Sequence, residues 1–190
     1  MTRTRRHVAL VGMRCSGKSS VGKALAQLLG APFVDLDDEL ARTANATAGT
    51  ARFHAAGDVL AEWGEPTFRN LESQVLRTVL EARDGRVIAT GGGAVLAPAN
   101  RAQLALRARC VWLVADSEEL ARRLRADPTP RPSLTGIDPA EELVTLAKER
   151  APFYAEVADF RLETAGHAPA ELARELLARL VERGPEHPGG

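Results

Sequence analysis

Residues Gly12 to Ser19 have the types and spacing of a loop that binds phosphate groups. They read Gly-Met-Arg-Cys-Ser-Gly-Lys-Ser and follow the apolar run 8–11. In such a P-loop, backbone N–H groups converge on phosphate oxygens, and the next helix directs its positive dipole end at the same anion. We predict that Lys18 reaches the β- and γ-phosphates of a nucleotide and that Ser19 binds Mg2+. The other predicted nucleotide-binding residues in this loop are Gly12, Arg14, Cys15, Ser16, Gly17 and Ser20.

Two carboxylates, Asp35 and Asp37, follow the second apolar run of the chain. One carboxylate there can hold Mg2+ through water, and the other can accept a proton from an attacking hydroxyl. Alternation along a strand would turn both side chains to the same face. For Asp38 and Glu39 we favour a structural role, because acidic residues stabilise the first turn of a helix.

Three glycines, Gly91 to Gly93, follow the third apolar run. Such a run lets the backbone pass close to a ligand, although a flexible turn has the same composition. Arg69, Arg131 and Arg150 stand apart from the many other arginines by their sequence contexts. A guanidinium can donate two parallel hydrogen bonds to a carboxylate or phosphate. The residues alone leave open whether these arginines bind a ligand or form surface ion pairs.

Apolar runs alternate with amphipathic segments along the chain, which predicts an α/β fold with a parallel sheet between helices. The expected strands are 7–11, 32–35, 86–90, 110–114 and 158–162. The expected helices are 19–29, 66–83 with shorter helical pieces before it, 100–107, 117–125 and 169–183. Ser117 is the expected N-cap of its helix. The strand before Gly12 and the helix after Ser19 argue against a chance match to the P-loop pattern. Two segments, 44–56 and 126–139, break the alternation.

The length of 190 residues fits one domain, expected over residues 1–183 and followed by a disordered tail at 184–190. Lys and Arg (25) balance Asp and Glu (25), which argues against a nucleic-acid partner. No apolar run is long enough for a membrane span, and the start is too short for a signal peptide. We therefore expect a cytoplasmic protein, a monomer, whose Cys15 and Cys110 are reduced thiols.

Several motifs, read in order, are similar to those of one enzyme family. They are the P-loop, the pair Asp35 and Asp37, Phe68-Arg69-x-x-Glu72, Ala89 to Val95, Arg131-Pro132, and Arg150-Ala-Pro-Phe-Tyr. Over roughly residues 8–164, the chain resembles the shikimate kinases, small P-loop kinases of aromatic amino-acid biosynthesis. Ordered motifs are more specific than any one of them alone.

The resemblance implies a three-layer P-loop kinase fold with a five-stranded parallel sheet in the order 2-3-1-4-5. It also implies an acceptor-binding subdomain at about 36–72 and a mobile lid at about 126–139. The implied reaction transfers the γ-phosphoryl group of ATP to the 3-hydroxyl of shikimate with Mg2+. Closure of the lid would exclude water and so prevent hydrolysis of ATP.

The resemblance also implies a role for each site residue. Lys18 and Ser19 would serve the phosphates and the metal, which Asp35 would support through water. Asp37 would bind the acceptor hydroxyls and act as base or orienter. Arg69 and Arg150 would bind the shikimate carboxylate, with Glu72 positioning Arg69 and with Gly91, Gly92 and Gly93 lining the pocket. Arg131 would approach the transferring phosphate, and Arg123 and Pro169 would enclose adenine.

The chain departs from the family pattern between Arg42 and Gly57, where it is about nine residues longer than expected. Such an insertion can be a surface loop or can reshape the acceptor pocket. One alternative is therefore a kinase of the same fold for another small polyol or cyclitol. A second alternative is a catalytically weak, nucleotide-binding regulatory module. The joint presence of the acceptor arginines Arg69 and Arg150 with Asp37 argues against that module.

Overall fold

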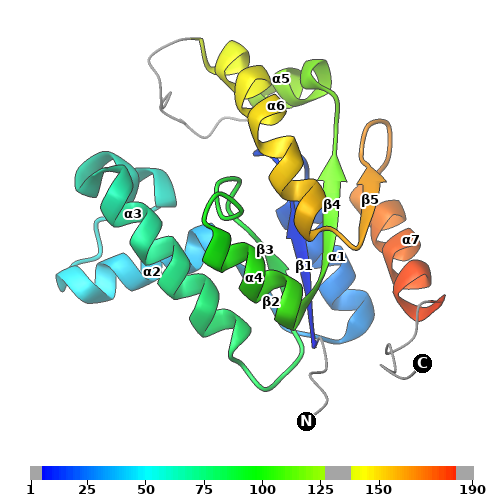
Figure 1. Cartoon of the computed structure of the whole chain (residues 1–190), viewed down its shortest axis with the longest axis horizontal. Coiled ribbons are helices and arrows are strands. Elements are labelled where there is room, and N and C mark those ends of the chain that lie inside the picture. The colour runs from blue at the N-terminus through cyan, green and yellow to red at the C-terminus, as the bar shows by residue number, and fades with distance from the viewer. Residues whose placement is uncertain (1–5, 127–137, 183–190) are drawn as a thin grey trace.

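Five parallel strands form the central sheet in this computed structural model, which describes residues 6–126 and 138–182 (Figure 1). The strands lie in the order β2-β3-β1-β4-β5, as expected. Their bounds are His7–Val11 for β1, Phe33–Asp35 for β2, Val87–Ala89 for β3, Ala108–Val114 for β4 and Phe160–Glu163 for β5. In the centre, Leu10 of β1 pairs with Ala89 on one side and Val111 on the other. Continuous apolar runs in β1 and β3 fit this position, because a parallel sheet is covered on both faces.

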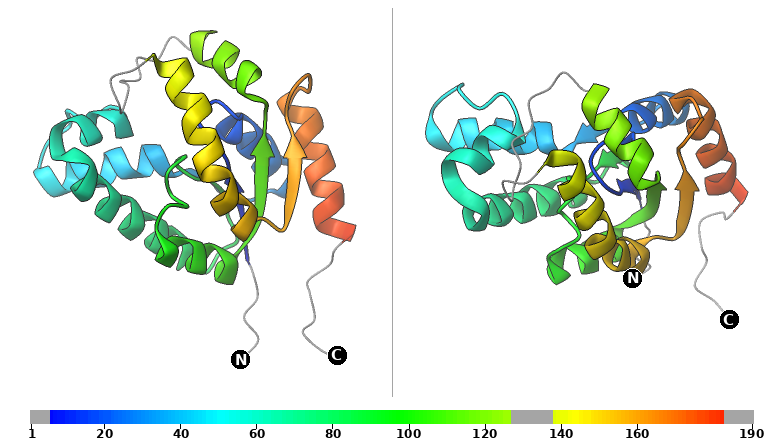
Figure 2. Two further views of the ribbon diagram at one scale, coloured as in Figure 1. Left: turned by 45° about the horizontal axis from the view of Figure 1, so that its top comes forward. Right: turned by 90° about the horizontal axis from the view of Figure 1, so that it is seen from above.

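Seven helices flank the sheet in the described part of the chain. Alternate residues of β1 face opposite sides, so Leu10 packs in one apolar cluster while Ala9 and Val11 pack in another. The first cluster joins the sheet to α1 and α7, and the second joins it to α3, α4 and α6 (Figure 2). This arrangement confirms the predicted three-layer fold. The helices are α1 (Lys18–Leu29), α2 (Leu36–Ala48), α3 (Ala56–Leu80), α4 (Pro98–Arg107), α5 (Ser117–Ala126), α6 (Pro139–Val157) and α7 (Pro169–Glu182).

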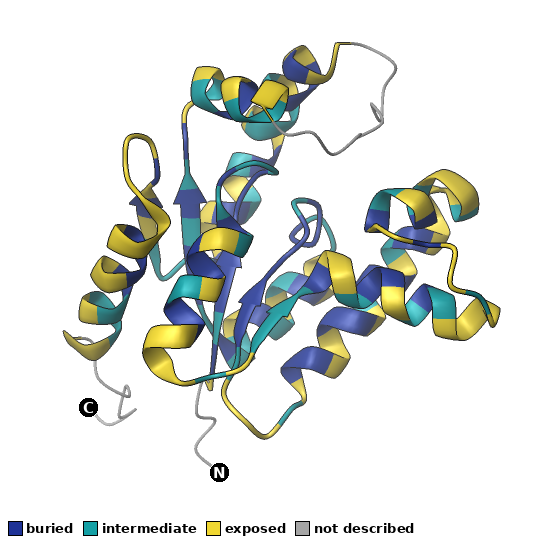
Figure 3. Cartoon of the chain, turned by 180° about the vertical axis from the view of Figure 1, so that it is seen from behind, coloured by how far each residue is buried: buried dark blue, intermediate teal, exposed yellow. Residues whose placement is uncertain are grey.

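Helix α2 and the first part of α3 project beyond the edge of the sheet (Figure 1). Helix α3 has a non-helical residue, Gly64 with φ of 75°, close to Pro66. The prediction of a long helix from Pro66 with shorter helical pieces before it fits α3, whose two parts meet at the kink at Gly64. Phe53 packs edge-on against Trp63 with ring centroids 5.3 Å apart. Buried residues follow one side of α2 and α3, and the other side is exposed (Figure 3).

Two predictions about irregular segments were wrong. Residues 44–48 of the segment 44–56 belong to α2, which ends at Gly49 in a left-handed conformation. Helix α6 was not predicted, because its sequence contains Pro139 and Pro152. Pro139 occupies the first turn, where a missing N–H costs nothing, and the Asp138 carboxylate accepts hydrogen bonds from the next two N–H groups.

A third prediction, the N-cap of α5, was also wrong. The cap is Asp116, whose Oδ1 accepts a hydrogen bond from the Glu119 N–H at 2.7 Å, and Ser117 is the first helical residue. Of the predicted lid, Ala126 ends α5 and Pro139 begins α6, while residues 127–137 and Arg131 with them lie outside the described residues. The predicted tail at 184–190 also lies outside them. Among the helices of residues 6–126 and 138–182, none is both long and apolar enough to cross a membrane.

Candidate active site

A cavity of about 1110 Å3 lies where β1, β2 and β3 end, and the predicted site residues converge on it. Ligands of open parallel sheets bind at this edge, because the loops that follow the strands meet there. Among the predicted site residues that the structure describes, Gly12 alone does not line the cavity. The lining includes Arg14, Cys15, Ser16, Gly17, Lys18, Ser19, Ser20, Asp35, Asp37, Arg69, Glu72, Gly91, Gly92, Gly93, Arg123, Arg150 and Pro169.

The loop between β1 and α1 is fixed by a close backbone approach at Gly12 and by hydrogen bonds from Lys18 to its carbonyl groups. Gly12 has φ of 142°, and a Cβ atom there would lie 2.5 Å from the carbonyl oxygen of Leu113. Gly12 therefore allows the loop to pass close to the end of β4. Lys18 Nζ donates hydrogen bonds to the carbonyls of Gly12 at 3.0 Å and Met13 at 2.7 Å. Lys18 and the N-terminus of α1 both line the cavity, and a helix N-terminus favours a bound anion.

Arg14 also lies in this loop, but its guanidinium is directed to α6. Its Nη2 donates to Glu142 Oε2 at 3.0 Å and to the Pro139 carbonyl at 3.2 Å. Glu142 is 1% exposed, so this is a buried ion pair between the P-loop and the helix that carries Arg150. Arg14 lines the cavity as predicted.

Ser19 and Asp35 lie together at the phosphate side of the cavity. The Ser19 hydroxyl donates to Asp35 Oδ2 at 2.5 Å. A hydroxyl and a carboxylate are hard oxygen ligands, the type that Mg2+ prefers when substrate phosphates supply further ligands. This pair therefore fits a magnesium ion.

Asp37 lines the cavity from a helix, not from a strand as predicted. Strand β2 ends at Asp35, which caps α2 by accepting a hydrogen bond from the Asp37 N–H at 3.1 Å. Asp37 is thus in the first turn of α2, and helix geometry places its side chain at the cavity. Asp38 and Glu39 also belong to that first turn, as expected, and Asp38 lines the cavity as well.

The three glycines after β3 allow charged side chains to approach the backbone. A Cβ atom on Gly91 would lie 2.7 Å from Glu72 Oε1 and 2.9 Å from Asp37 Oδ1. A Cβ atom on Gly93 would overlap the Arg69 guanidinium. Side chains at these positions would displace the residues predicted to bind the acceptor. Gly91 and Gly93 thus lie in close contact with these charged side chains, whereas Gly92 has room for ordinary contacts.

Arg69 and Arg150 line the cavity close to these glycines. Arg69 Nη1 donates to Glu72 Oε2 at 2.8 Å, and its Nε lies 3.4 Å from Glu65 Oε1. Burial raises the pKa of Glu72, and the neighbouring Arg69 charge partly offsets this effect. Arg150 is 8% exposed, and its Nη1 would lie 3.7 Å from a Cβ atom on Gly92. Two guanidinium groups and the Asp37 carboxylate thus share one end of the cavity.

Tyr154 was not predicted as a site residue, although it lies one turn after Arg150 in the motif. Its hydroxyl donates to the Gly92 carbonyl at 2.6 Å and contacts Met13 Sδ at 3.4 Å. Burial raises the pKa of Tyr154 to about 12, so the hydroxyl keeps its proton and remains a donor. Tyr154 therefore joins α6 to the glycine run behind the acceptor end.

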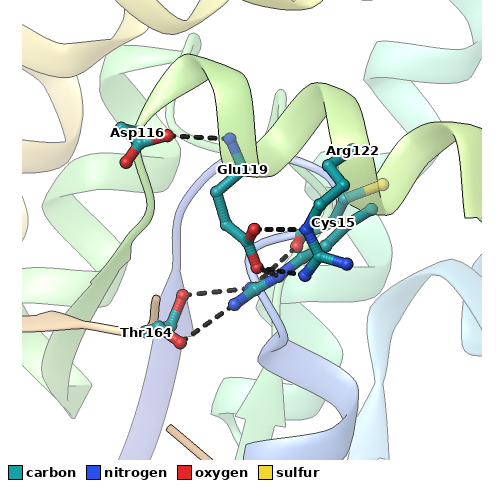
Figure 4. A network of polar contacts seen from close by, with 6 residues as sticks. Cys15, Asp116, Glu119, Arg122 and Thr164 are labelled. Atoms are coloured by element: carbon teal, nitrogen blue, oxygen red, sulfur yellow. Dashed lines mark hydrogen bonds and ion pairs between the residues drawn. The ribbon is translucent and has the colours of Figure 1, made fainter. Parts of the chain in front are cut away.

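Arg123 of α5 lines the cavity beside the P-loop. It donates to the Cys15 carbonyl, to both oxygens of Thr164 and to Glu119. The side chains of Glu119 and Thr164 point toward one another beside the P-loop in Figure 4. Pro169 lines the same cavity as the first residue of α7. Sequence reasoning missed Glu119 and Thr164, because neither has a motif of its own.

The family model described as shikimate kinase matches residues 14–181. The chain belongs to the shikimate kinase family. A shikimate kinase from Symbiobacterium thermophilum is 41% identical over 94% of this chain and 98% of that protein. Another shikimate kinase, from Gloeobacter violaceus, is 44% identical over 91% of this chain and 93% of its own length. The solved structure of the shikimate kinase from Acinetobacter baumannii in complex with shikimate aligns with a TM-score of 0.83 at 33% identity, covering 97% of each chain.

Shikimate kinase relatives thus match nearly the whole length of the chain. His54, Ala55 and Ala56 line the cavity. The end of the segment 44–56 thus borders the cavity.

Proposed function

We propose that this protein is a shikimate kinase that transfers the γ-phosphoryl group of ATP to the 3-hydroxyl of shikimate. The observation that carries the proposal is the placement of Arg69, Arg150 and Asp37 at one end of a cavity whose other part is a P-loop. A carboxylate on the acceptor would match the two guanidinium groups, and its hydroxyls would match Asp37. Relatives named shikimate kinase, one of them solved with shikimate, support this assignment.

The acceptor end would fix the position of shikimate before the chemical step. Arg69 and Arg150 would donate hydrogen bonds to the carboxylate, and Glu72 would hold Arg69 through the 2.8 Å ion pair. Asp37 would accept a hydrogen bond from the reacting hydroxyl. Such positioning lowers the barrier, because it removes the need to orient two reactants during the reaction.

The nucleotide end would hold ATP through the P-loop backbone and Lys18. Ser19 would bind Mg2+, and Asp35 would support it through water, as the 2.5 Å contact between their oxygen atoms suggests. When bound, Mg2+ neutralises negative charge that develops on the phosphate oxygens. Arg123 and Pro169 would contact the base.

In the transfer step, the acceptor oxygen forms a bond to the γ-phosphorus while the bond to the β,γ-bridging oxygen breaks. ADP leaves, and Asp37 accepts the hydroxyl proton. Lys18 stabilises charge on the transferring group. Arg131 and closure of the 126–139 segment remain predictions for this step.

An acceptor panel tests the proposal. ATP consumption and product formation would be measured with shikimate, quinate, gluconate and cyclitols. We expect phosphorylation of shikimate with the highest kcat/KM. A higher kcat/KM for gluconate or a cyclitol would support the polyol kinase instead, and nucleotide binding without phosphorylation of any acceptor would support the regulatory module.

We further propose that residues 1–183 act as one domain and that the enzyme works as a cytoplasmic monomer on small molecules, without nucleic-acid or membrane partners. Its equal numbers of basic and acidic residues support the absence of a nucleic-acid partner. Light scattering of the purified protein checks the monomer, and a dimer at micromolar concentration would contradict it.

A further inference from the structure

Arg123 uses most of its hydrogen-bonding capacity within the protein. Its Nε donates to Glu119 Oε1 at 2.7 Å, and its Nη1 donates to the Cys15 carbonyl at 3.2 Å and to Thr164 Oγ1 at 3.1 Å. Its Nη2 donates to the Thr164 carbonyl at 2.9 Å. Because a guanidinium has five N–H donors, these four bonds use nearly the whole edge of the group. A ligand beside Arg123 would therefore meet mainly its flat face.

The partners of Arg123 are themselves fixed. Thr164 is 1% exposed, and its N–H donates to the Val114 carbonyl at 2.7 Å. The Glu119 N–H is held by Asp116 Oδ1 at 2.7 Å (Figure 4). Hydrogen bonds from Arg122 and Arg123 lower the pKa of Glu119 to about 2, so its carboxylate stays ionised at neutral pH. Two anchors on different elements thus determine the plane of the guanidinium.

These anchors lie at the end of the cavity away from Arg69 and Arg150. Thr164, Gly166, His167 and Pro169 line this region together with Arg123, after strand β5 and at the start of α7. The Cys15 carbonyl belongs to the P-loop, so the guanidinium is also joined to the phosphate end. A planar cation in this position suits stacking against a nucleotide base, which tolerates different bases because each has a π-face.

We propose that Glu119 and Thr164 are positioning residues for the nucleotide base, which hold the Arg123 plane so that the base stacks on it. This inference rests on the proposed function, because it assumes that the P-loop binds the phosphates of ATP. Neither residue touches the reacting atoms. Their contribution is preorganisation: with Arg123 already oriented, binding does not have to order a long side chain.

Equilibrium binding of two probes tests the inference. The affinity for ADP depends on contacts to both the base and the phosphates, whereas the affinity for pyrophosphate depends on the phosphate contacts alone. Thr164→Val removes the hydroxyl acceptor, and Glu119→Gln removes the charge. We expect each variant to weaken ADP binding about tenfold and pyrophosphate binding less than about twofold, with the KM for shikimate unchanged.

Two further variants separate positioning from a general structural effect. Thr164→Ser retains the hydroxyl and should restore ADP affinity to near the wild-type value. Glu118→Gln makes the same charge change at the neighbouring, exposed position of α5 and should leave ADP affinity unchanged. Unchanged ADP affinity in Thr164→Val and Glu119→Gln, or equal losses for ADP and pyrophosphate, would overturn the inference. Wild-type protein that binds ADP but does not phosphorylate shikimate would overturn only the proposed function, and wild-type protein that does not bind ADP would overturn both.

Discussion

Arg69 donates from Nη1 to the carboxylate of Glu72 at 2.8 Å, one turn further along helix α3. Glu72 is 4% exposed, so the ion pair is largely removed from water. Removing one partner of such a pair leaves an uncompensated buried charge, which is strongly destabilising. Because Glu65 contacts the same guanidinium from an exposed position, the helix offers a natural comparison between a buried and an exposed partner.

We predict that Glu72→Gln raises the KM for shikimate about tenfold and leaves the KM for ATP within about twofold. The reason is that Arg69 loses its charge-assisted partner and its fixed orientation. Steady-state kinetics with each substrate varied in turn checks this. Glu65→Gln is the matched control, expected to change neither KM by more than about twofold because an exposed ion pair contributes little. Equal effects of the two substitutions would show that Glu72 has no special role.

Asp37→Asn should lower kcat for shikimate phosphorylation by about a hundredfold or more. The amide keeps the shape of the side chain but cannot accept the proton of the acceptor hydroxyl. ADP affinity, measured by calorimetry, should stay near the wild-type value. Glu39→Gln, in the same turn of α2 but outside the cavity lining, should keep kcat within a few-fold. Wild-type turnover by the Asp37 variant would remove Asp37 from the proposed mechanism.

The backbone of Cys15 predicts a stabilising substitution. Cys15 has φ of 64°, the left-handed region that costs residues with a Cβ atom about 1–2 kcal/mol. Glycine avoids this cost but gives the unfolded chain more freedom, which offsets about 0.5–1 kcal/mol. The two effects leave a gain of about 0–1.5 kcal/mol, and loss of the Cys15 side chain's packing against the core reduces it. Cys15→Gly should therefore raise the free energy of unfolding by less than about 1.5 kcal/mol in urea titrations. Ser is the control, because Cys15→Ser keeps the Cβ atom and should give no gain.

His7 predicts how stability depends on pH. Its buried ring accepts a hydrogen bond at Nδ1 from the Arg86 N–H at 3.3 Å, which places the proton on Nε2, 3.2 Å from the Leu80 carbonyl. Burial lowers the pKa of His7 below its ordinary value of 6.5. As the pH falls below 6.5, His7 therefore binds a proton in the unfolded chain before it does so in the folded protein. The free energy of unfolding decreases as a result.

We expect this loss to reach at most about 1.4 kcal/mol per pH unit between pH 6.5 and the lowered pKa of His7. Urea unfolding at several pH values between 5 and 7.5 measures it. His7→Gln should flatten the profile in this window, whereas the exposed His54→Gln should not. A wild-type profile that is already flat would contradict the prediction.

The features that the sequence predicted well depend on local patterns. The run before Gly12 is apolar because β1 is buried on both faces, and the expected and observed bounds of β1 agree at His7–Val11. The P-loop carries its own geometry in the spacing of Gly12, Gly17 and Lys18. The family motifs then gave the strand order and the residues that meet in the cavity.

The features that were missed depend on the folded structure. Tyr154 contacts Gly92 across 62 residues, and Arg123 contacts Thr164 across 41, so no local pattern signals either pair. Helix α6 was missed because Pro152 argues against a helix interior, although packing against β4 and α5 outweighs that local preference. Asp37 lines the cavity, but the strand alternation used to predict its direction does not apply, because Asp37 lies in the first turn of α2.

The most direct test of the central claim measures whether the enzyme recognises a carboxylate on its acceptor. Shikimate would be compared with its reduced analogue, which carries a hydroxymethyl group in place of the carboxylate, for the wild type, Arg69→Lys and Arg150→Lys. Lysine keeps the charge but loses the planar pair of donors. We predict that the wild type prefers shikimate by about ten- to a hundredfold in kcat/KM, and that each variant loses much of this preference while its KM for ATP changes less than about twofold. A wild-type enzyme that phosphorylates both compounds equally well would contradict the shikimate kinase assignment and favour a kinase for an uncharged polyol.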